Sequence, residues 1–477
     1  MADLSAGGAA PPPPGSASPP PGSDPDAAAR AERGRTFRRR SLSSLAWTLG
    51  GTGLQRSLSL VSNLILTRLL MPEAFGLMAV VVMVGVMIEL ISDIGVRQSV
   101  IRSERGEERH FLRVAWTVRF VRGLFVAGGV LAVAGLLWLL APALAPPDSV
   151  YADPRLPALI AVSALTIVLG SAESIGVIRD ARRMNLRRNT VLMTVSHVVT
   201  FAATLGAVLI EPSVWALVIG TAIGTAFRVL ASHALHRDLV GPPVWDRAIA
   251  AEMWTFGRWI IGSSVAFFIL SNGGRLILGA LLDARAFGLF AIAMLWVQSG
   301  VTVMRAISNS VIFSAFAETL RDRRDAFPAL LGRARAGFYA ILALGFACAL
   351  GAGDLLIRTI YPEEYYGASV FLILMSVDFL IRQQSLASSI LLSEGRSAVM
   401  AVANAVAVVV MIAGMLTAWR LAGPNATVLA MVLAPLAAAP ILFVHAKRAV
   451  PAISIRWDMA MIGATLAAAG LAYLLAA

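Results

Sequence analysis

A stretch of sixteen residues occurs twice in this chain at a constant offset. Residues 64–79 are LILTRLLMPEAFGLMA, and residues 276–291, which lie 212 positions later, are LILGALLDARAFGLFA. Ten of the sixteen positions are identical, including the Ala-Phe-Gly-Leu that starts at Ala74 and at Ala286. Self-similarity at a fixed offset predicts a duplicated unit of about 200 residues.

The sequence between and around the two copies is strongly apolar. Of the 477 residues, 58% are hydrophobic and only 14% are charged, and the mean hydropathy is +0.76. Segments of about 20 apolar residues, long enough to cross a hydrocarbon core of about 30 Å, recur throughout. We therefore predict an all-α polytopic membrane protein. Duplicated membrane bundles are typical of transporters that open a central site to each side in turn.

The apolar runs predict twelve spans in two parallel six-helix lobes, followed by a further hydrophobic segment. The predicted parts are a disordered Pro-rich cytoplasmic tail (1–41), an N-terminal lobe (42–238), a C-terminal lobe (239–450) and the extra segment (451–477). The tail is rich in Pro, Gly, Ala and Ser and cannot build a core. Two interpretations of the extra segment stay open, a thirteenth span or a helix in the membrane interface.

Positive charge marks one side of the predicted bundle. The net charge is +12, and arginines concentrate in alternate connections, at residues 35–40, 97–113, 179–188, 237–247, 321–324 and 447–448. The other connections are short and mostly acidic or nearly uncharged, such as 146–154 and 361–366. Because cytoplasmic loops are enriched in Lys and Arg, we predict a cytoplasmic N-terminus. The same rule accounts for the positive net charge, so we predict no nucleic-acid partner. The first span of each lobe then runs from the cytoplasm outward, so the lobes are parallel copies related by an axis along the membrane normal.

Polar side chains inside the predicted spans are the candidate functional residues, because burying them in lipid is costly. Arg56, Arg275 and Arg382 lie near mid-membrane depth and predict a basic cavity between the lobes. Guanidinium groups offer forked donors to phosphate or sugar-acid oxygens. The predicted substrate-binding residues are Gln55, Arg56, Asn272, Arg275, Gln298 and Arg382.

Two acidic residues inside spans are candidates for ion coupling, Asp378 and Glu173. Asp378 precedes Arg382 by four residues on one helix face, so the two residues are equally well explained as a structural ion pair.

The sequence does not predict catalysis or a cofactor. His233 and His236 share a helix face, but the sequence around them does not supply a full set of ligands for a metal site, so contact with lipid headgroups is favoured. No GxxxxGK[ST] nucleotide motif occurs, and the single Cys348 excludes an internal disulfide. We expect no catalytic residue, no metal and no cofactor.

Four stretches carry a family resemblance. They are LTRLLMPEAFGLMAVVVMVGVMIELISDIGVRQSVI (66–101), GVIRDARRMNLRR (176–188), FGRWIIGSSVAFFILSNGGRLILGALLDARAFGLFAIA (256–293) and SVIFSAFAETLRDRRDAF (310–327). In their order and spacing the chain resembles the polysaccharide-transport (Wzx-type) oligosaccharide flippases of the multidrug/oligosaccharidyl-lipid/polysaccharide (MOP) superfamily. The resemblance covers the predicted spans 1 to 12.

The resemblance implies a V-shaped pair of lobes in the bacterial inner membrane that works by alternating access. It also implies outward flipping of undecaprenyl-pyrophosphate-linked oligosaccharides for O-antigen, capsule or exopolysaccharide. The implied partners are this lipid-linked glycan, membrane lipids, and the polymerase and glycosyltransferases of the same pathway. Members of the family have 12 or 14 spans, so a thirteenth span would be a departure.

Two other functions remain as alternatives. A cation-coupled multidrug exporter of the same superfamily should carry acidic residues in the lobe interior, whereas the deepest charges here include three arginines. A membrane glycosyltransferase or polymerase usually needs a sizeable outer loop for its acidic residues, and no such loop is predicted. Both observations favour the flippase.

Overall fold

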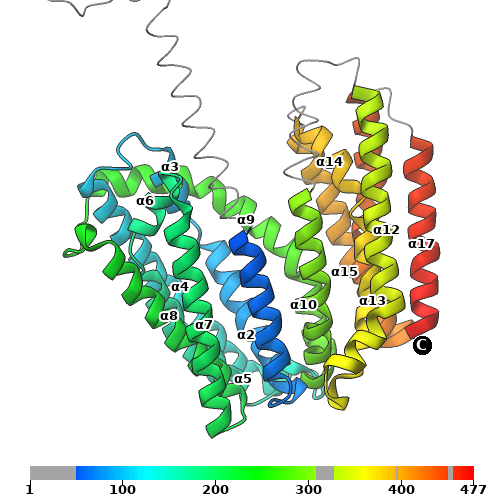
Figure 1. Ribbon diagram of the computed structural model, residues 1–477, viewed down its shortest axis with the longest axis horizontal. Helices are drawn as coiled ribbons and strands as arrows, with labels where there is room; N and C mark the ends of the chain where they lie inside the picture. The colour runs from blue at the N-terminus through cyan, green and yellow to red at the C-terminus, as the bar shows by residue number, and fades with distance from the viewer. Residues whose placement is uncertain (1–49, 308–326, 394–395, 450–454, 477) are drawn as a thin grey trace, which may run out of the picture.

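The computed structural model describes residues 50–307, 327–393, 396–449 and 455–476, and within these ranges the chain is almost entirely helical (Figure 1). No β-strand occurs in these ranges, so the all-α prediction is confirmed. The predicted disordered tail (1–41) and most of the basic segment 310–327 lie outside the described residues.

The N-terminal half begins with a helix over residues 50–66. It continues with α2 (Pro72–Ile91), α3 (Val96–Arg102), α4 (Arg109–Leu144), η1 (Val150–Ala152), α5 (Leu156–Ser171), α6 (Gly176–Arg182), α7 (Leu186–Ile210), α8 (Val214–Leu235) and η2 (Arg237–Leu239). Pro72 is the first residue of α2, where a missing N–H costs no helical hydrogen bond.

The C-terminal half repeats this order. It contains α9 (Arg247–Leu281), α10 (Ala284–Ile307), α12 (Phe327–Ile360), η5 (Glu363–Tyr365), α13 (Ala368–Ile381), α14 (Gln384–Ser393), α15 (Ser397–Leu433), η6 (Ala434–Ala438), α16 (Ala439–Ala449) and α17 (Ile455–Ala476). The offset of the sequence repeat persists in the helices, because it separates the first residues of α2 and α10 and also those of α5 and α13.

Breaks in the helices also repeat between the halves. The fourth span of the N-terminal half is broken between α5 and α6, which are bent by 58°, and its counterpart is broken between α13 and α14. Helix α15 is interrupted at Gly423, whose φ of 77° is open only to glycine at low cost, and Pro424 follows. The two parts of α15, before and after this interruption, correspond to α7 and α8 of the N-terminal half.

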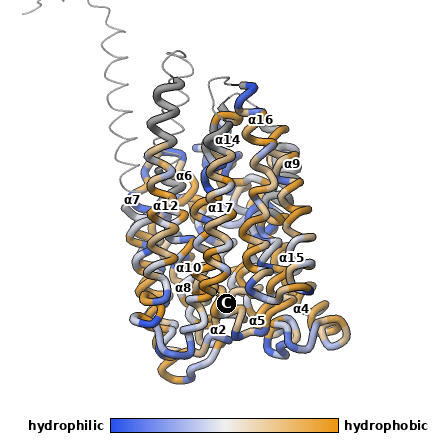
Figure 2. Tube along the Cα trace, turned by 90° about the vertical axis from the view of Figure 1, so that its right-hand side faces the viewer, coloured by the Kyte–Doolittle hydropathy of each residue, from blue (hydrophilic) through white to orange (hydrophobic). Residues whose placement is uncertain are grey.

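Eight helices within the described ranges are long and apolar enough to cross a membrane, or nine if α5 and α6 count as one bent span. One of the eight is α17, which packs against α13 and α15. The Asn425 amide also donates a hydrogen bond of 3.1 Å to the carbonyl of Ala476. Residues 455–476 of the extra C-terminal segment therefore form a helix of the C-terminal bundle. Figure 2 shows apolar residues over the middle of the molecule and hydrophilic residues toward its two ends.

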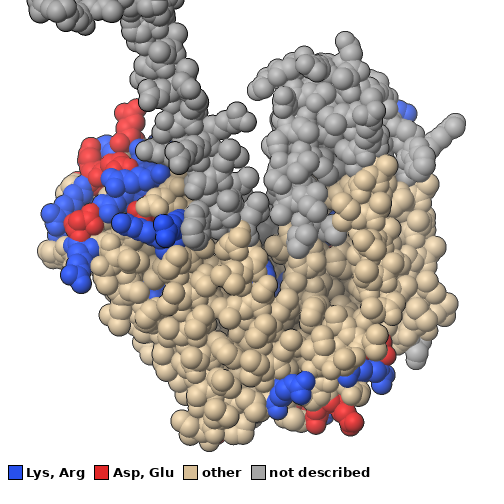
Figure 3. All heavy atoms as spheres, in the orientation of Figure 1, with Lys and Arg blue, Asp and Glu red and all other residues tan. Residues whose placement is uncertain are grey.

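The two halves meet at one end and are separated at the other (Figure 1). A hollow between them opens toward the separated end, and basic atoms are visible in it (Figure 3). At the closed end, α2 crosses α10 through the duplicated motif. A Cβ atom on Gly76 would lie 2.1 Å from the carbonyl oxygen of Ala284, and one on Gly288 would lie 1.9 Å from that of Pro72. The two copies of the repeat therefore pack against each other, and each requires its glycine.

Hydrogen bonds reinforce this lobe junction, by which we mean the α2–α10 crossing and the bonded residues around it. Tyr361 donates to Asn63 Oδ1 at 3.0 Å and accepts from Trp296 Nε1 at 2.9 Å. Burial raises the pKa of Tyr361 to about 12, so the phenol keeps the proton that it donates. Further bonds between the halves are Tyr365 Oη to Leu70 O, Arg68 Nη2 to Ile360 O, Val150 N to Leu282 O and Tyr151 Oη to Leu276 O.

Candidate functional site

The basic connections of the N-terminal half gather at the separated end of the molecule (Figure 3). Arg182 donates to the carbonyl of Val100 at 2.8 Å, and Arg113 donates to that of Pro242 at 2.7 Å. Arg183 forms an ion pair with Glu107. Three connections that the arginine pattern predicted on one side of the membrane are therefore in contact.

The predicted substrate residues of the first and seventh spans differ in their surroundings. On the helix over residues 50–66, Gln55 is half-buried, and Arg56 is exposed with no ion-pair or hydrogen-bond partner among the described residues. On α9, the predicted pairing of Asn272 and Arg275 is present, because Arg275 Nη1 donates to Asn272 Oδ1 at 3.2 Å. Arg275 is half-buried, and its Nε has no hydrogen-bond partner within the described part of the chain.

The remaining predicted residues lie on α10 and at the break that follows α13. Gln298 is half-buried on α10. Arg382, the first residue after α13, forms an ion pair of 2.5 Å with Asp378. This geometry matches the structural alternative for that pair. Arg56, Arg275 and Arg382 thus lie on three different elements, the helix over residues 50–66, α9 and the end of α13.

Glu173, the other predicted coupling residue, lies in the break between α5 and α6. Its side chain is buried, and its Oε2 accepts a hydrogen bond of 2.9 Å from Arg119 Nη2 on α4. The same guanidinium donates to the carbonyl oxygens of Gly170 at 3.1 Å and of Glu173 at 3.3 Å. Arg119 thereby satisfies carbonyl groups that lose their helical partners where α5 ends.

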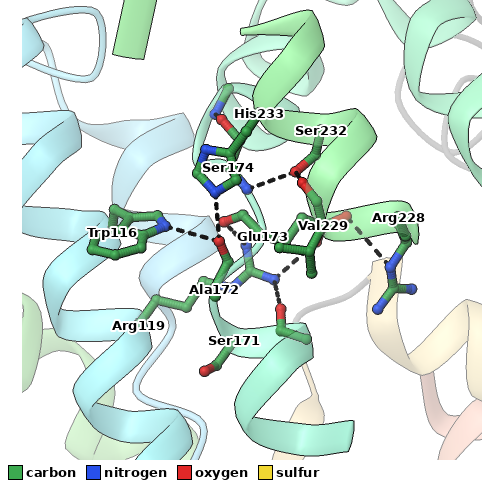
Figure 4. Close-up of polar contacts among 12 residues, drawn as sticks. Trp116, Arg119, Ser171, Ala172, Glu173, Ser174, Arg228, Val229, Ser232 and His233 are labelled. Carbon is green, nitrogen blue, oxygen red and sulfur yellow. Dashed lines mark hydrogen bonds and ion pairs between the residues drawn. The ribbon is translucent and has the colours of Figure 1, made fainter. Parts of the chain in front are cut away.

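Further side chains of α4 and of α8 hold the same break (Figure 4). Trp116 Nε1 on α4 and His233 Nε2 on α8 both donate to the carbonyl of Ala172, at 3.2 Å and 2.8 Å. Since a carbonyl can only accept, the Nε2 atom of His233 carries a hydrogen. The Ser232 hydroxyl accepts a hydrogen bond of 2.9 Å from the backbone N–H of Ser174. The break is thus fixed by α4 on one side and by α8 on the other.

The expectation that His233 and His236 contact lipid headgroups is wrong. His233 bonds to the helix break, and His236 is buried with Nε2 3.0 Å from Asp180 Oδ2. The bend after α5 brings residues 172–180 against the end of α8, which the sequence spacing did not reveal. No cluster of three or more His, Cys, Asp or Glu with metal-binding geometry occurs among the described residues.

Arg228 also lies beside Glu173 at the break between α5 and α6, and it was not among the residues predicted from the sequence. This residue lies on α8, and its Nε is 3.6 Å from Glu173 Oε1. A signal was present, since Arg228 is the only charged residue in the apolar run 213–232. Its partner lies in another predicted span, far earlier in the sequence, so only the fold shows the pairing.

Comparison with known proteins identifies relatives of this chain. The sequence profile of a family described as "Polysaccharide biosynthesis protein" matches residues 65–370. The lipopolysaccharide biosynthesis protein WzxC of Escherichia coli (strain K12) is 21% identical over 311 residues, 65% of this chain and 59% of that protein. The succinoglycan biosynthesis transport protein ExoT of Rhizobium meliloti (strain 1021) is 24% identical over 277 residues, 57% of this chain and 53% of that protein. The match thus spans less than two thirds of each relative.

Solved structures share the fold over most of their length. An inward-facing multidrug resistance MATE family transporter of the MOP superfamily superposes with a TM-score of 0.59 at 14% identity, covering 83% of this chain and 95% of that one. The lipid II flippase MurJ in an inward closed conformation gives a TM-score of 0.58 at 12% identity, covering 91% and 98%. The predicted MOP-like fold is therefore confirmed.

Proposed function

Because this chain belongs to the polysaccharide biosynthesis protein family, we propose that it flips undecaprenyl-pyrophosphate-linked oligosaccharides outward across the inner membrane. The names of the two relatives, a lipopolysaccharide biosynthesis protein and a succinoglycan biosynthesis transport protein, support a polysaccharide pathway. The carrying observation is the hollow between two duplicated helical halves, closed at one end and containing basic atoms (Figure 3). On this proposal the protein is a transporter rather than an enzyme, and the pathway's polymerase and glycosyltransferases are its partners.

Transport would proceed by relative movement of the two lobes, residues 42–238 and 239–450. The hydrogen bonds of the lobe junction and the α2–α10 crossing hold one end closed, so the substrate can enter only from the other end. Opening the junction while the other end closes would expose the same site to the opposite side. The arginine-rich connections support an inward-open state, with the basic end in the cytoplasm.

The orientation is testable by thiol labelling in a background where Cys348 is replaced. Cysteines at Asp148 and Gly367, which are exposed near the closed end, should react with an impermeant reagent added outside intact cells. Cysteines at Glu104 and Asn185, exposed at the basic end, should react only after the membrane is made permeable. Labelling of the second pair alone in intact cells would reverse the orientation.

The substrate's anionic head would bind to the polar residues of the hollow. We propose Arg275, Arg56 and Arg382 as its phosphate-binding side chains, with Gln55, Asn272 and Gln298 as hydrogen-bonding residues. Arg275 is the best supported of these, because it is half-buried and its only hydrogen bond within the described structure goes to neutral Asn272. A guanidinium in this setting keeps donors available for a phosphate.

Replacing Arg275 should therefore stop export without preventing membrane insertion. We expect Arg275→Gln to lower polysaccharide export at least about tenfold, as for loss of one charge-assisted hydrogen bond. Arg275→Lys should recover part of it, since an ammonium keeps the charge but loses the fork. Arg285→Gln, which changes an exposed arginine at the start of α10, is the matched control and should export normally. Wild-type export from Arg275→Gln would remove this residue from the site.

The polysaccharide-export assay also tests which residue couples transport to an ion. We propose that Asp378 carries the coupling ion despite its ion pair with Arg382. Asp378→Asn should then reach the membrane in normal amount but export little, whereas loss of the protein itself would assign the pair a purely structural role.

A further inference from the structure

Two guanidinium groups share one carboxylate at the break of the fourth span. Arg119 reaches Glu173 from α4, and Arg228 reaches it from α8 (Figure 4). The three side chains together carry one net positive charge. Since intramembrane charge is costly, an excess charge at this position calls for an explanation.

The contacts of the two arginines are unequal. Arg119 makes the close contact, 2.9 Å to Glu173 Oε2, and also bonds to two backbone carbonyls. Arg228 Nε is 3.6 Å from Glu173 Oε1, beyond hydrogen-bond distance, and has no hydrogen-bond partner within the described residues. Arg119 therefore bonds one carboxylate oxygen of Glu173, Oε2, while Oε1 has no hydrogen-bond partner among the described residues. Arg228 is held near Oε1 by charge attraction.

The side chain of Arg228 is also partly accessible, although its Nε atom is buried. Its side chain is 30% exposed, whereas that of Glu173 is 8% exposed. In Figure 4 the Arg228 side chain points away from Ala172 and the helix break, toward the side where ribbons of the C-terminal half are visible. On the α5 side the guanidinium lies next to Gly170, where a Cβ atom would be 3.6 Å from Nη2 and 3.7 Å from Thr225 Cγ2.

Arg228 lies seven residues before the end of α8, which corresponds to about 10 Å along the helix. This depth is below the surface of the basic end but short of the middle of the membrane. The diphosphate of a lipid that enters from that end would pass this level first. Guanidinium groups bind phosphate oxygens through two parallel hydrogen bonds.

We propose that Arg228 binds the diphosphate of the transported lipid and that Glu173 is a positioning residue, which holds Arg228 without touching the substrate. This inference rests on the proposed function and adds a second phosphate-binding position, in the N-terminal half, to that of Arg275. It assigns Glu173 a different role from ion coupling. The competing explanation is that Arg228 only balances the charge of Glu173.

Removal of both charges separates the two explanations. Arg228→Gln should lower polysaccharide export at least about tenfold, and the double variant Arg228→Gln/Glu173→Gln should be as defective. If Arg228 only balanced Glu173, the neutral double variant would recover export, and this result would overturn the proposal. Arg228→Lys keeps the charge next to Glu173, so it should fold normally and still export less than the wild type.

A direct binding measurement distinguishes failure of this inference from failure of the proposed function. For the purified full-length protein, titration with geranylgeranyl diphosphate should give a Kd at least about tenfold higher for Arg228→Gln than for the wild type. Arg237→Gln, which changes an exposed arginine at the same end, should leave the Kd unchanged. An unchanged Kd for Arg228→Gln, with a raised one for Arg275→Gln, would reject the Arg228 position alone. An unchanged Kd for both variants would reject the phosphate-binding site of the proposed function as well.

Discussion

Any side chain larger than hydrogen at Gly76 or Gly288 should abolish transport, because it would force the lobe junction open. The Cβ atom of Gly76→Ala would lie 2.1 Å from the backbone oxygen of Ala284, and that of Gly288→Ala 1.9 Å from the oxygen of Pro72. Backbone cannot move aside as a flexible side chain can, so α2 and α10 must separate. Overpacking typically costs about 1–3 kcal/mol, and valine should cost more than alanine.

The expected result is a shift toward the state that is open at the junction end. In intact cells, a cysteine replacing buried Ala74 on α2 should become reactive to an impermeant reagent in the Gly76→Val and Gly288→Val backgrounds, and export should be lost. Gly85→Ala is the matched control on the same helix, since its Cβ atom would meet only Ile167 Cδ1 at 3.8 Å. Normal export from both valine variants would show that the crossing is not a closure that transport requires.

The duplicated motif illustrates what the sequence could and could not predict about the fold. The constant offset predicted two equivalent units, and the helix starts at Pro72 and Ala284 follow it. The sequence did not indicate that the two copies pack on each other. Helix periodicity and repeats are properties of one segment, whereas the partner of a glycine depends on how the lobes pack. A glycine pair at equivalent positions in a duplicated membrane protein is therefore a candidate crossing point.

The candidate site shows the same limit. The pairs Asn272–Arg275 and Asp378–Arg382 were predictable, because spacings of three and four residues place side chains on one helix face. The cluster around Glu173 was not, since its partners lie on α4 and α8, in spans that are distant in the sequence. Glu173 itself was identified from its depth in an apolar segment, but depth does not reveal a partner. His233 was misinterpreted for the same reason.

Replacing Arg119 should have the largest effect on the amount of folded protein. Arg119→Ala or Arg119→Gln removes the hydrogen bonds to Gly170 O, to Glu173 O and to the buried carboxylate of Glu173 at once. Removal of one partner from a buried ion pair typically costs about 3–5 kcal/mol, because the other charge stays buried. Since whole proteins are stable by only about 5–15 kcal/mol, we expect a strongly reduced membrane level and a lower Tm in detergent.

The matched comparison is Arg228→Gln, which removes the other arginine near Glu173. Because Arg119 still engages the carboxylate, this variant should reach the membrane at close to the wild-type level while export falls. Adding Glu173→Gln to Arg119→Gln should restore part of the lost Tm, since the buried unpaired charge disappears, but the carbonyls of the break stay unbonded. Equal Tm values for Arg119→Gln and Arg228→Gln would contradict this division of roles, because the two guanidiniums would then support the break to the same extent.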